Sequence, residues 1–208
     1  MAQVQEHPKQ PDGGRKYGAY QMMILRMLRD TAHRDLRTEL FGHKLESPLL
    51  IAPIGVQTIF HHDKEDCVAE VAAEIGVPYI LSTASSSSIE DVAKANGGGV
   101  GFFQLYWPQD DEITISLLKR AKSSGFTVLL VTLDTWTLTW RPADLDNAYL
   151  PFASGTGDQT GFSDPAFRRK FTEKHKKEVE DDDFLASREW ANEVFSGTAH
   201  TWEQLELH

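Results

Sequence analysis

The chain has one cysteine, no long apolar run and a deficit of positive charge, and each shortage excludes a class of protein. Cys67 is the only cysteine among 208 residues, which excludes an internal disulfide framework. No apolar run approaches the ~20 residues of a membrane span, and no early basic-then-apolar stretch resembles a signal peptide. A net charge of −10 argues against nucleic acid or an anionic membrane as a partner. We therefore expect a soluble cytoplasmic protein with neither partner.

The sequence alternates short apolar runs with amphipathic stretches. Strands are predicted over 48–56, 77–81, 101–106 and 127–133, and helices over 63–75, 88–96 and 112–124. The strand centres recur about every 25 residues, which is the spacing of βα units. Asp63 is the expected N-cap of the first helix, and Ser88 with Asp91 predicts a capping box at the second.

Glycine-rich phosphate loops are also missing, and this absence bears on the fold. Four βα units fit half of an eight-stranded barrel or the body of an open doubly wound sheet. The open sheet predicts a phosphate loop after the first strand, but no GxGxxG or Walker sequence follows any expected strand. We therefore predict the N-terminal half of a (β/α)8 TIM barrel, truncated, with four βα units and a long lid-like insertion.

Composition divides the chain into five segments. We expect a polar disordered lead over 1–20, a helical or extended segment over 21–46, the first four barrel strands over 47–134, a loop or lid insertion over 135–200, and the start of a truncated helix over 201–208.

Within the insertion, residues 143–183 look loop-like. The block from Arg168 to Asp183 has six basic and six acidic residues, so it is locally neutral and favours a solvated helix or a mobile flap over a binding patch. A helix is expected over 184–195, and Thr201 with Gln204 predicts a further capping box.

Two of the apolar runs turn polar where their strands should leave the sheet. Gln104 and Tyr106 end one run, and Thr132 and Asp134 end the next. Side chains two apart on a strand share a face, and the C-terminal edge of a parallel sheet carries the chemistry of α/β folds. Each residue alone could hydrogen-bond a backbone group at the strand end or lie at the edge of the core. Their shared register favours a site.

At these residues the chain resembles the FMN-dependent α-hydroxy acid oxidising family, whose fold is a (β/α)8 barrel. The matching segments are Ala52–Val56, Leu81–Thr83, Phe103–Tyr106 and Leu133–Thr135 with Arg141. Within the family, the chain is most similar to the lactate 2-monooxygenase branch. The segments that carry this closer likeness are Tyr17–Gln21, Ala52–Val56, Leu133–Trp136, Trp140–Pro142 and the long insertion ending in Thr201–Glu203.

The resemblance implies an FMN site and a small L-2-hydroxy acid as substrate. The positions matching the family's flavin site are Pro53, Ile54 and Gly55 through backbone groups and Ser82, Gln104 and Thr132 through side chains. Tyr106 would face the substrate, and Arg141 would hold its carboxylate. Asp134 would orient a catalytic histidine.

In the implied reaction, a hydride passes to FMN and O2 reoxidises the flavin. In the lactate 2-monooxygenase branch, the keto acid and peroxide then react before release, giving a decarboxylated acid, carbon dioxide and water.

Several of the family's groups have no match here. The catalytic base is a histidine in an H-G-G-R type sequence, and none of the eight histidines in this chain precedes a glycine. The flavin-facing lysine and the phosphate site belong to later strands, so we expect weak or absent FMN binding by the chain alone. No metal site is expected, because His61 and His62 lack the partner spacing of one and fit an exposed pair.

Open sheet edges predict a homo-oligomer or a complementing C-terminal half. The alternative function is a catalytically inactive fragment or an interaction module that keeps the half-barrel fold.

Overall fold

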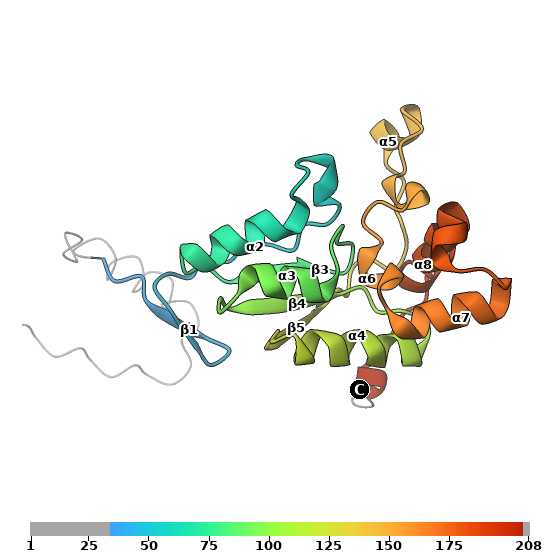
Figure 1. Cartoon of the computed structure of the whole chain (residues 1–208). Coiled ribbons are helices and arrows are strands. Elements are labelled where there is room, and N and C mark those ends of the chain that lie inside the picture. The colour runs from blue at the N-terminus through green and yellow to red at the C-terminus, as the bar shows by residue number, and fades with distance from the viewer. Residues whose placement is uncertain (1–33, 206–208) are drawn as a thin grey trace, which may run out of the picture. The chain divides into compact units, whose positions relative to one another are not determined.

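The computed structural model describes residues 34–205, and Arg37 begins a unit that continues to the C-terminus. The expected lead over 1–20, and 21–33 of the next segment, lie outside the described residues. The strands are β1 (Thr38–Leu40), β2 (His43–Leu45), β3 (Tyr79–Ser82), β4 (Gly101–Leu105) and β5 (Val128–Val131). The helices are η1 (Gln57–Ile59), α2 (Lys64–Glu74), α3 (Ile89–Asn96), α4 (Asp111–Ser123), α5 (Pro142–Asp146), η2 (Pro151–Ser154), α6 (Gln159–Phe162), α7 (Pro165–His175), η3 (Val179–Asp181), α8 (Asp183–Val194) and α9 (Trp202–Leu205) (Figure 1).

A parallel sheet in the order β3-β4-β5 forms the centre of this unit. Helices α3 and α4 connect the successive strands, as parallel neighbours require. The register sets Ser82 opposite Gln104 and Gln104 opposite Leu130. The structure thus confirms three of the four predicted strands. It describes no helix between residues 34 and 205 that is long and apolar enough to cross a membrane.

The first predicted strand, over 48–56, is wrong as a strand. Only one parallel bridge joins this segment to the sheet, between Ile51 and Tyr79. The Ile51 N–H donates to the Pro78 carbonyl at 2.9 Å. Pro48 and Pro53 have no N–H to contribute to a ladder, which limits the pairing to a short stretch between them. The four-unit count is therefore not confirmed.

The helix starts agree with the sequence except in one detail. The Asp91 N–H donates to Ser88 Oγ at 3.1 Å, and that hydroxyl donates to the Asp91 carboxylate at 2.7 Å, so Ser88 caps α3 as predicted. Asp63 stands at the N-cap position of α2, but its side chain makes no capping hydrogen bond. Asp110 does cap α4, through bonds from the Glu112 and Ile113 N–H groups.

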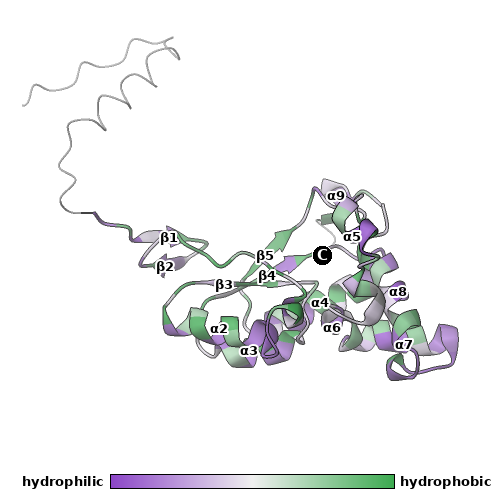
Figure 2. Cartoon of the chain, turned by 90° about the horizontal axis from the view of Figure 1, so that it is seen from above, coloured by the Kyte–Doolittle hydropathy of each residue, from purple (hydrophilic) through white to green (hydrophobic). Residues whose placement is uncertain are grey.

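The two faces of the sheet have different surroundings. Tyr79, Leu81, Phe103 and Leu105 belong to one buried cluster with apolar residues of α2, α3 and α4. Residues at the alternate positions, such as Phe102, point to the other face. Figure 2 shows β5 as hydrophobic along its length. The C-terminal ends of the strands therefore emerge from an apolar body.

A short hairpin, β1–β2, packs near the N-terminal ends of the parallel strands. Phe41 and Gly42 form its turn with φ of 50° and 81°. The Phe41 ring meets Phe102 edge-on with centroids 5.9 Å apart, and His43 Nε2 lies 2.8 Å from Thr127 Oγ1. The helices of the insertion lie at the opposite end of the sheet (Figure 1).

The insertion is more helical than the sequence suggests. Residues 143–183 were expected to be loop-like, but they contain α6 and α7, and α7 packs beside α4. Arg120 of α4 is the central connection: it forms a two-bond pair with Glu90 at 2.7 and 2.8 Å and reaches Asp164 at 3.1 Å. Asp164 is fully buried and also caps α7. The charged block is thus partly an anchored helix.

A second acidic residue of the insertion is buried without such partners. Asp158 is 1% exposed, and neither carboxylate oxygen accepts a well-formed hydrogen bond from the described residues. Burial raises the pKa of Asp158 to about 7, and the nearby Ser187 hydroxyl opposes the shift only partly. The carboxyl is therefore neutral in the folded protein at mildly acidic pH.

Replacing Gly161 by alanine should destabilise the fold by about 1–3 kcal/mol, because the core has no room for the added carbon. A Cβ on Gly161 would lie 2.2 Å from the buried Trp190 ring. Gly98→Ala is the matched control, since a Cβ there meets nothing within 4 Å. Urea denaturation measures both variants, and equal free energies of unfolding would contradict this packing.

Asp158→Asn should stabilise the protein increasingly as pH rises toward 7. The folded protein keeps the Asp158 proton up to about pH 7, whereas the unfolded carboxyl loses it near its ordinary value of 3.8. The stability advantage of the variant should grow by about 1 kcal/mol per pH unit in that window and level off above it. Denaturation at several pH values measures the difference, with the partly exposed Asp144→Asn as control. A gap that does not change with pH would refute the assignment.

Candidate functional site

A line of hydrogen bonds joins the C-terminal ends of the three parallel strands. The Ser82 hydroxyl of β3 donates to Gln104 Oε1 at 3.1 Å. Gln104 Nε2, on β4, donates at 2.9 Å to the hydroxyl of Thr132, which directly follows β5. Ser82 and Gln104 are nearly fully buried. The structure thus brings together the three side chains that the sequence assigned to one site.

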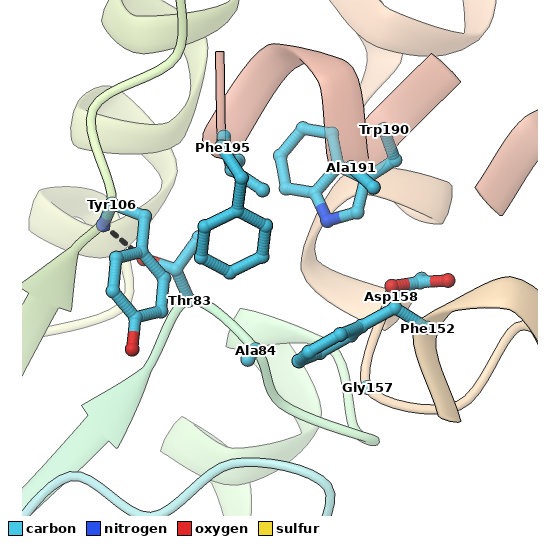
Figure 3. Close-up of a pocket in the computed structure, with 10 residues that line it drawn as sticks. Thr83, Ala84, Tyr106, Phe152, Gly157, Asp158, Trp190, Ala191 and Phe195 are labelled. Atoms are coloured by element: carbon cyan, nitrogen blue, oxygen red, sulfur yellow. Dashed lines mark hydrogen bonds between the residues drawn. The ribbon is translucent and has the colours of Figure 1, made fainter. Parts of the chain in front are cut away.

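Thr83 completes this line and was not singled out as a site residue from the sequence. Its N–H donates to Gln104 Oε1 at 3.2 Å, and its hydroxyl donates to the Gln104 carbonyl at 2.6 Å. The same hydroxyl accepts from the Tyr106 N–H at 3.0 Å (Figure 3). The signal available in the sequence was a hydroxyl residue directly after Ser82 at a strand end.

Tyr106, Asp134 and Arg141 form the charged side of the site. Burial raises the pKa of the Tyr106 hydroxyl, Arg141 opposes the rise, and Asp134 adds to it, so both charges act on this phenol. Asp134 is exposed in the loop after β5. Arg141 precedes α5, with its guanidinium largely exposed and 3.8 Å from the Asp144 carboxylate. The Arg141 side chain is therefore available to an anionic ligand.

The segment 53–55 supplies exposed backbone at the same end of the sheet. Pro53 and Ile54 are exposed, and Gly55 is partly exposed. A Cβ on Gly55 would lie 2.6 Å from the Ala84 carbonyl oxygen. That oxygen also accepts the Val56 N–H at 2.8 Å. Glycine at position 55 therefore allows this segment to lie directly against the loop after β3.

The insertion approaches the same loop from the other side. A Cβ on Gly157 would lie 2.9 Å from the Ala84 carbonyl oxygen. The Phe195 ring lies 5.0 Å from Tyr106 and 5.6 Å from Phe152, centroid to centroid. Figure 3 shows Phe195 between Tyr106 and Trp190, on the wall of a small hollow. The sequence did not indicate that aromatic residues of the insertion cover Tyr106, because their contact spans about 90 residues of chain.

Comparison with known proteins relates this arrangement to one family. A family model described as FMN-dependent dehydrogenase matches residues 14–207. An FMN-dependent alpha-hydroxy acid dehydrogenase of Penicillium citrinum, qulF, is 54% identical over 185 residues, which cover 89% of this chain and 46% of that protein. The L-lactate oxidase of Lysinibacillus sphaericus is 36% identical over 145 residues, which cover 70% of this chain and 38% of that protein.

A solved structure agrees with these relatives. The crystal structure of a mandelate oxidase with benzoyl-formic acid matches with a TM-score of 0.56 and 35% identity, over 60% of this chain and 37% of that one. The chain spans less than half the length of these three proteins. Because the family model covers nearly the whole sequence, the chain belongs to the FMN-dependent dehydrogenase family.

Proposed function

We propose that this chain supplies the flavin-ring and substrate side of a site that oxidises a small L-2-hydroxy acid with FMN. The observation that carries the proposal is the hydrogen-bonded line Ser82–Gln104–Thr132 at the strand ends, with Tyr106 directly after the end of β4. One edge of the sheet thus offers polar groups for a ring and, beside them, a phenol under the influence of Arg141 and Asp134.

The donor set fits a flat heterocycle with hydrogen-bonding edges. Gln104 keeps one amide proton beyond its bond to Thr132, and the Thr132 hydroxyl proton is also free to donate. Among residues 34–205, the N–H groups of Ile54 and Gly55 donate to no backbone acceptor. These groups would hold the flavin ring, and FMN, when bound, supplies the acceptor for a hydride from the α-carbon of the substrate.

The same edge of the sheet carries the side chains that would bind the substrate. The planar guanidinium of Arg141 suits a two-bond contact with a carboxylate. The Tyr106 hydroxyl would donate to the oxygen that becomes a carbonyl. Asp134 would orient an imidazole base and stabilise its charged form after proton transfer.

We further propose that the substrate is lactate and that the outcome resembles that of lactate 2-monooxygenase. The similarity to an L-lactate oxidase supports a small substrate, as does the Phe195 ring over Tyr106. The insertion from α5 to α8 would act as a lid that retains the keto acid and peroxide until they react.

A second candidate is a non-catalytic interaction module. Strand β5 is the edge of the parallel sheet, and the apolar side chains of Leu129 and Leu133 are 39% and 56% exposed. An exposed apolar edge strand favours pairing with another chain, either a second copy or a complementing half barrel. This candidate shares the fold and differs in having no turnover.

The purified chain should bind FMN weakly and saturably, and Gln104→Leu should weaken binding about tenfold. One or two lost hydrogen bonds correspond to roughly 1.4 kcal/mol, which is a tenfold change in Kd. Quenching of flavin fluorescence measures the affinity.

Thr132→Ala should weaken FMN binding in the same direction, and the exposed Gln204→Leu is the matched control. Circular dichroism must show that each variant is folded. Unchanged affinity in folded Gln104→Leu and Thr132→Ala would contradict the assigned ring contacts.

With FMN and L-lactate, the chain alone should consume oxygen no faster than free FMN. Loss of a positioned base lowers the rate on the order of 10²–10⁴-fold, and we propose that no side chain of this chain serves as that base. An oxygen electrode measures the uptake. Saturable, lactate-dependent uptake would show that this chain provides its own base and would exclude the interaction module as the sole function.

A further inference from the structure

The turn before α2 gathers three metal-ligand side chains that the proposed function does not use. His61, His62 and Asp63 link η1 to α2, and their side chains are more than half exposed. One ligand atom from each residue lies within 4.8 Å of the other two. At such distances, a single metal ion can bind one ligand atom of each residue.

The individual distances match the geometry of a transition-metal site. His61 Nδ1 lies 3.4 Å from Asp63 Oδ2, and His62 Nε2 lies 3.2 Å from Asp63 Oδ1. Ligands on a tetrahedral ion with 2.1 Å bonds are about 3.4 Å apart. The two imidazole rings lie side by side, with centroids 4.2 Å apart, so a bound ion would require them to turn toward the carboxylate.

The Asp63 carboxylate does not cap helix α2. Asp63 occupies the N-cap position of α2, yet it accepts no hydrogen bond from the first turn. Asp110, Asp164 and Asp182, at the same position of other helices, all accept such bonds. The carboxylate of Asp63 instead faces the two imidazoles.

The backbone holds this turn in place. The His61 N–H donates to the Gln57 carbonyl at 3.1 Å, and the Lys64 N–H donates to the His61 carbonyl at 3.1 Å. The Asp63 N–H donates to His61 Nδ1 at 3.2 Å. The lone pair of Nδ1 therefore accepts this N–H, and an ion that binds Nδ1 would take the place of the hydrogen bond.

The surroundings add negative charge. His62 and Asp63 line an open groove together with Lys64, Asp66, Cys67, Glu70 and Ala95. Three carboxylates and one ammonium in the groove attract a cation. Cys67 lies within it, with its thiol donating to the Lys64 carbonyl at 3.3 Å.

We propose that His61, His62 and Asp63 bind a divalent transition-metal ion such as Zn²⁺ or Ni²⁺, with water in the remaining positions. Two imidazoles and one carboxylate select such ions over Mg²⁺, which prefers oxygen ligands alone. The site lies beyond residues 53–55, so the ion would fasten the loop that leads from the flavin-facing segment to α2.

Isothermal titration calorimetry of the full chain with ZnCl2 tests the proposal. We expect one site per chain, at least tenfold weaker in His62→Ala and in Asp63→Asn, with His43→Gln as a matched control that binds like the wild type.

Four results would overturn the proposal. One is the absence of saturable Zn²⁺ binding. Another is unchanged affinity in the folded double variant His61→Ala/His62→Ala. The third is loss of binding in Cys67→Ser while the histidine variants bind normally, which would place the ion on the thiol. Displacement of Zn²⁺ by equimolar MgCl2 would likewise assign the binding to the acidic groove.

Discussion

The side-chain amide of Gln104 is the interaction on which the candidate site depends. Its oxygen accepts two hydrogen bonds, from the Ser82 hydroxyl and the Thr83 N–H, and its nitrogen donates to Thr132. These bonds tie three parallel strands together at the point where backbone pairing ends. A buried polar group without such partners would cost 1–3 kcal/mol, so the line is stable only when complete. The polar groups of the site are therefore positioned before any ligand arrives.

The second constraint is a largely buried arginine, Arg120, which connects the insertion to the helices beside the parallel sheet. The guanidinium of Arg120 is largely buried and bonds to Glu90 of α3 and to Asp164 at the start of α7. It also donates to the Thr160 carbonyl at 3.0 Å. Charge-assisted bonds with good geometry on every side allow such a charge to be buried. The barrel helices and the cover over Tyr106 thus share one ionic centre, and we infer that they fold as one unit.

The polar ends of β4 and β5 could be predicted from the sequence because the pattern that indicates them is local. Alternation within 101–106 and 127–133 set Gln104 and Thr132 on one face, and the register of β4 and β5 agrees with this. The strand predicted over 48–56 failed because its prolines interrupt pairing despite its apolar composition. The hairpin β1–β2 is not predicted from the sequence. Its turn requires a positive φ at Phe41, and phenylalanine is not a residue that indicates such a turn.

The insertion was harder to predict for a different reason. Charge dominates the composition of α7, while the apolar contacts that fix it come from Phe167 and Phe171, one turn apart. The Phe167 ring contacts Trp190 on α8, and the contact between Tyr106 and Phe195 joins residues still farther apart in the sequence. Such contacts depend on packing across elements and leave no periodic signal. Asp63 is the opposite case: the N-cap position was predicted, but the side chain faces two histidines instead.

The carbonyl of Ala84, in the loop after β3, lies close to both the segment 53–55 and the insertion. Two glycines from distant segments, Gly55 and Gly157, both lie so near its carbonyl oxygen that a Cβ on either would collide with it. A side chain at either glycine would displace the loop after β3 that carries this carbonyl. Natural variation there should consequently be correlated: homologues that carry the insertion should retain glycine at both positions 55 and 157, because a Cβ at either would meet the Ala84 carbonyl.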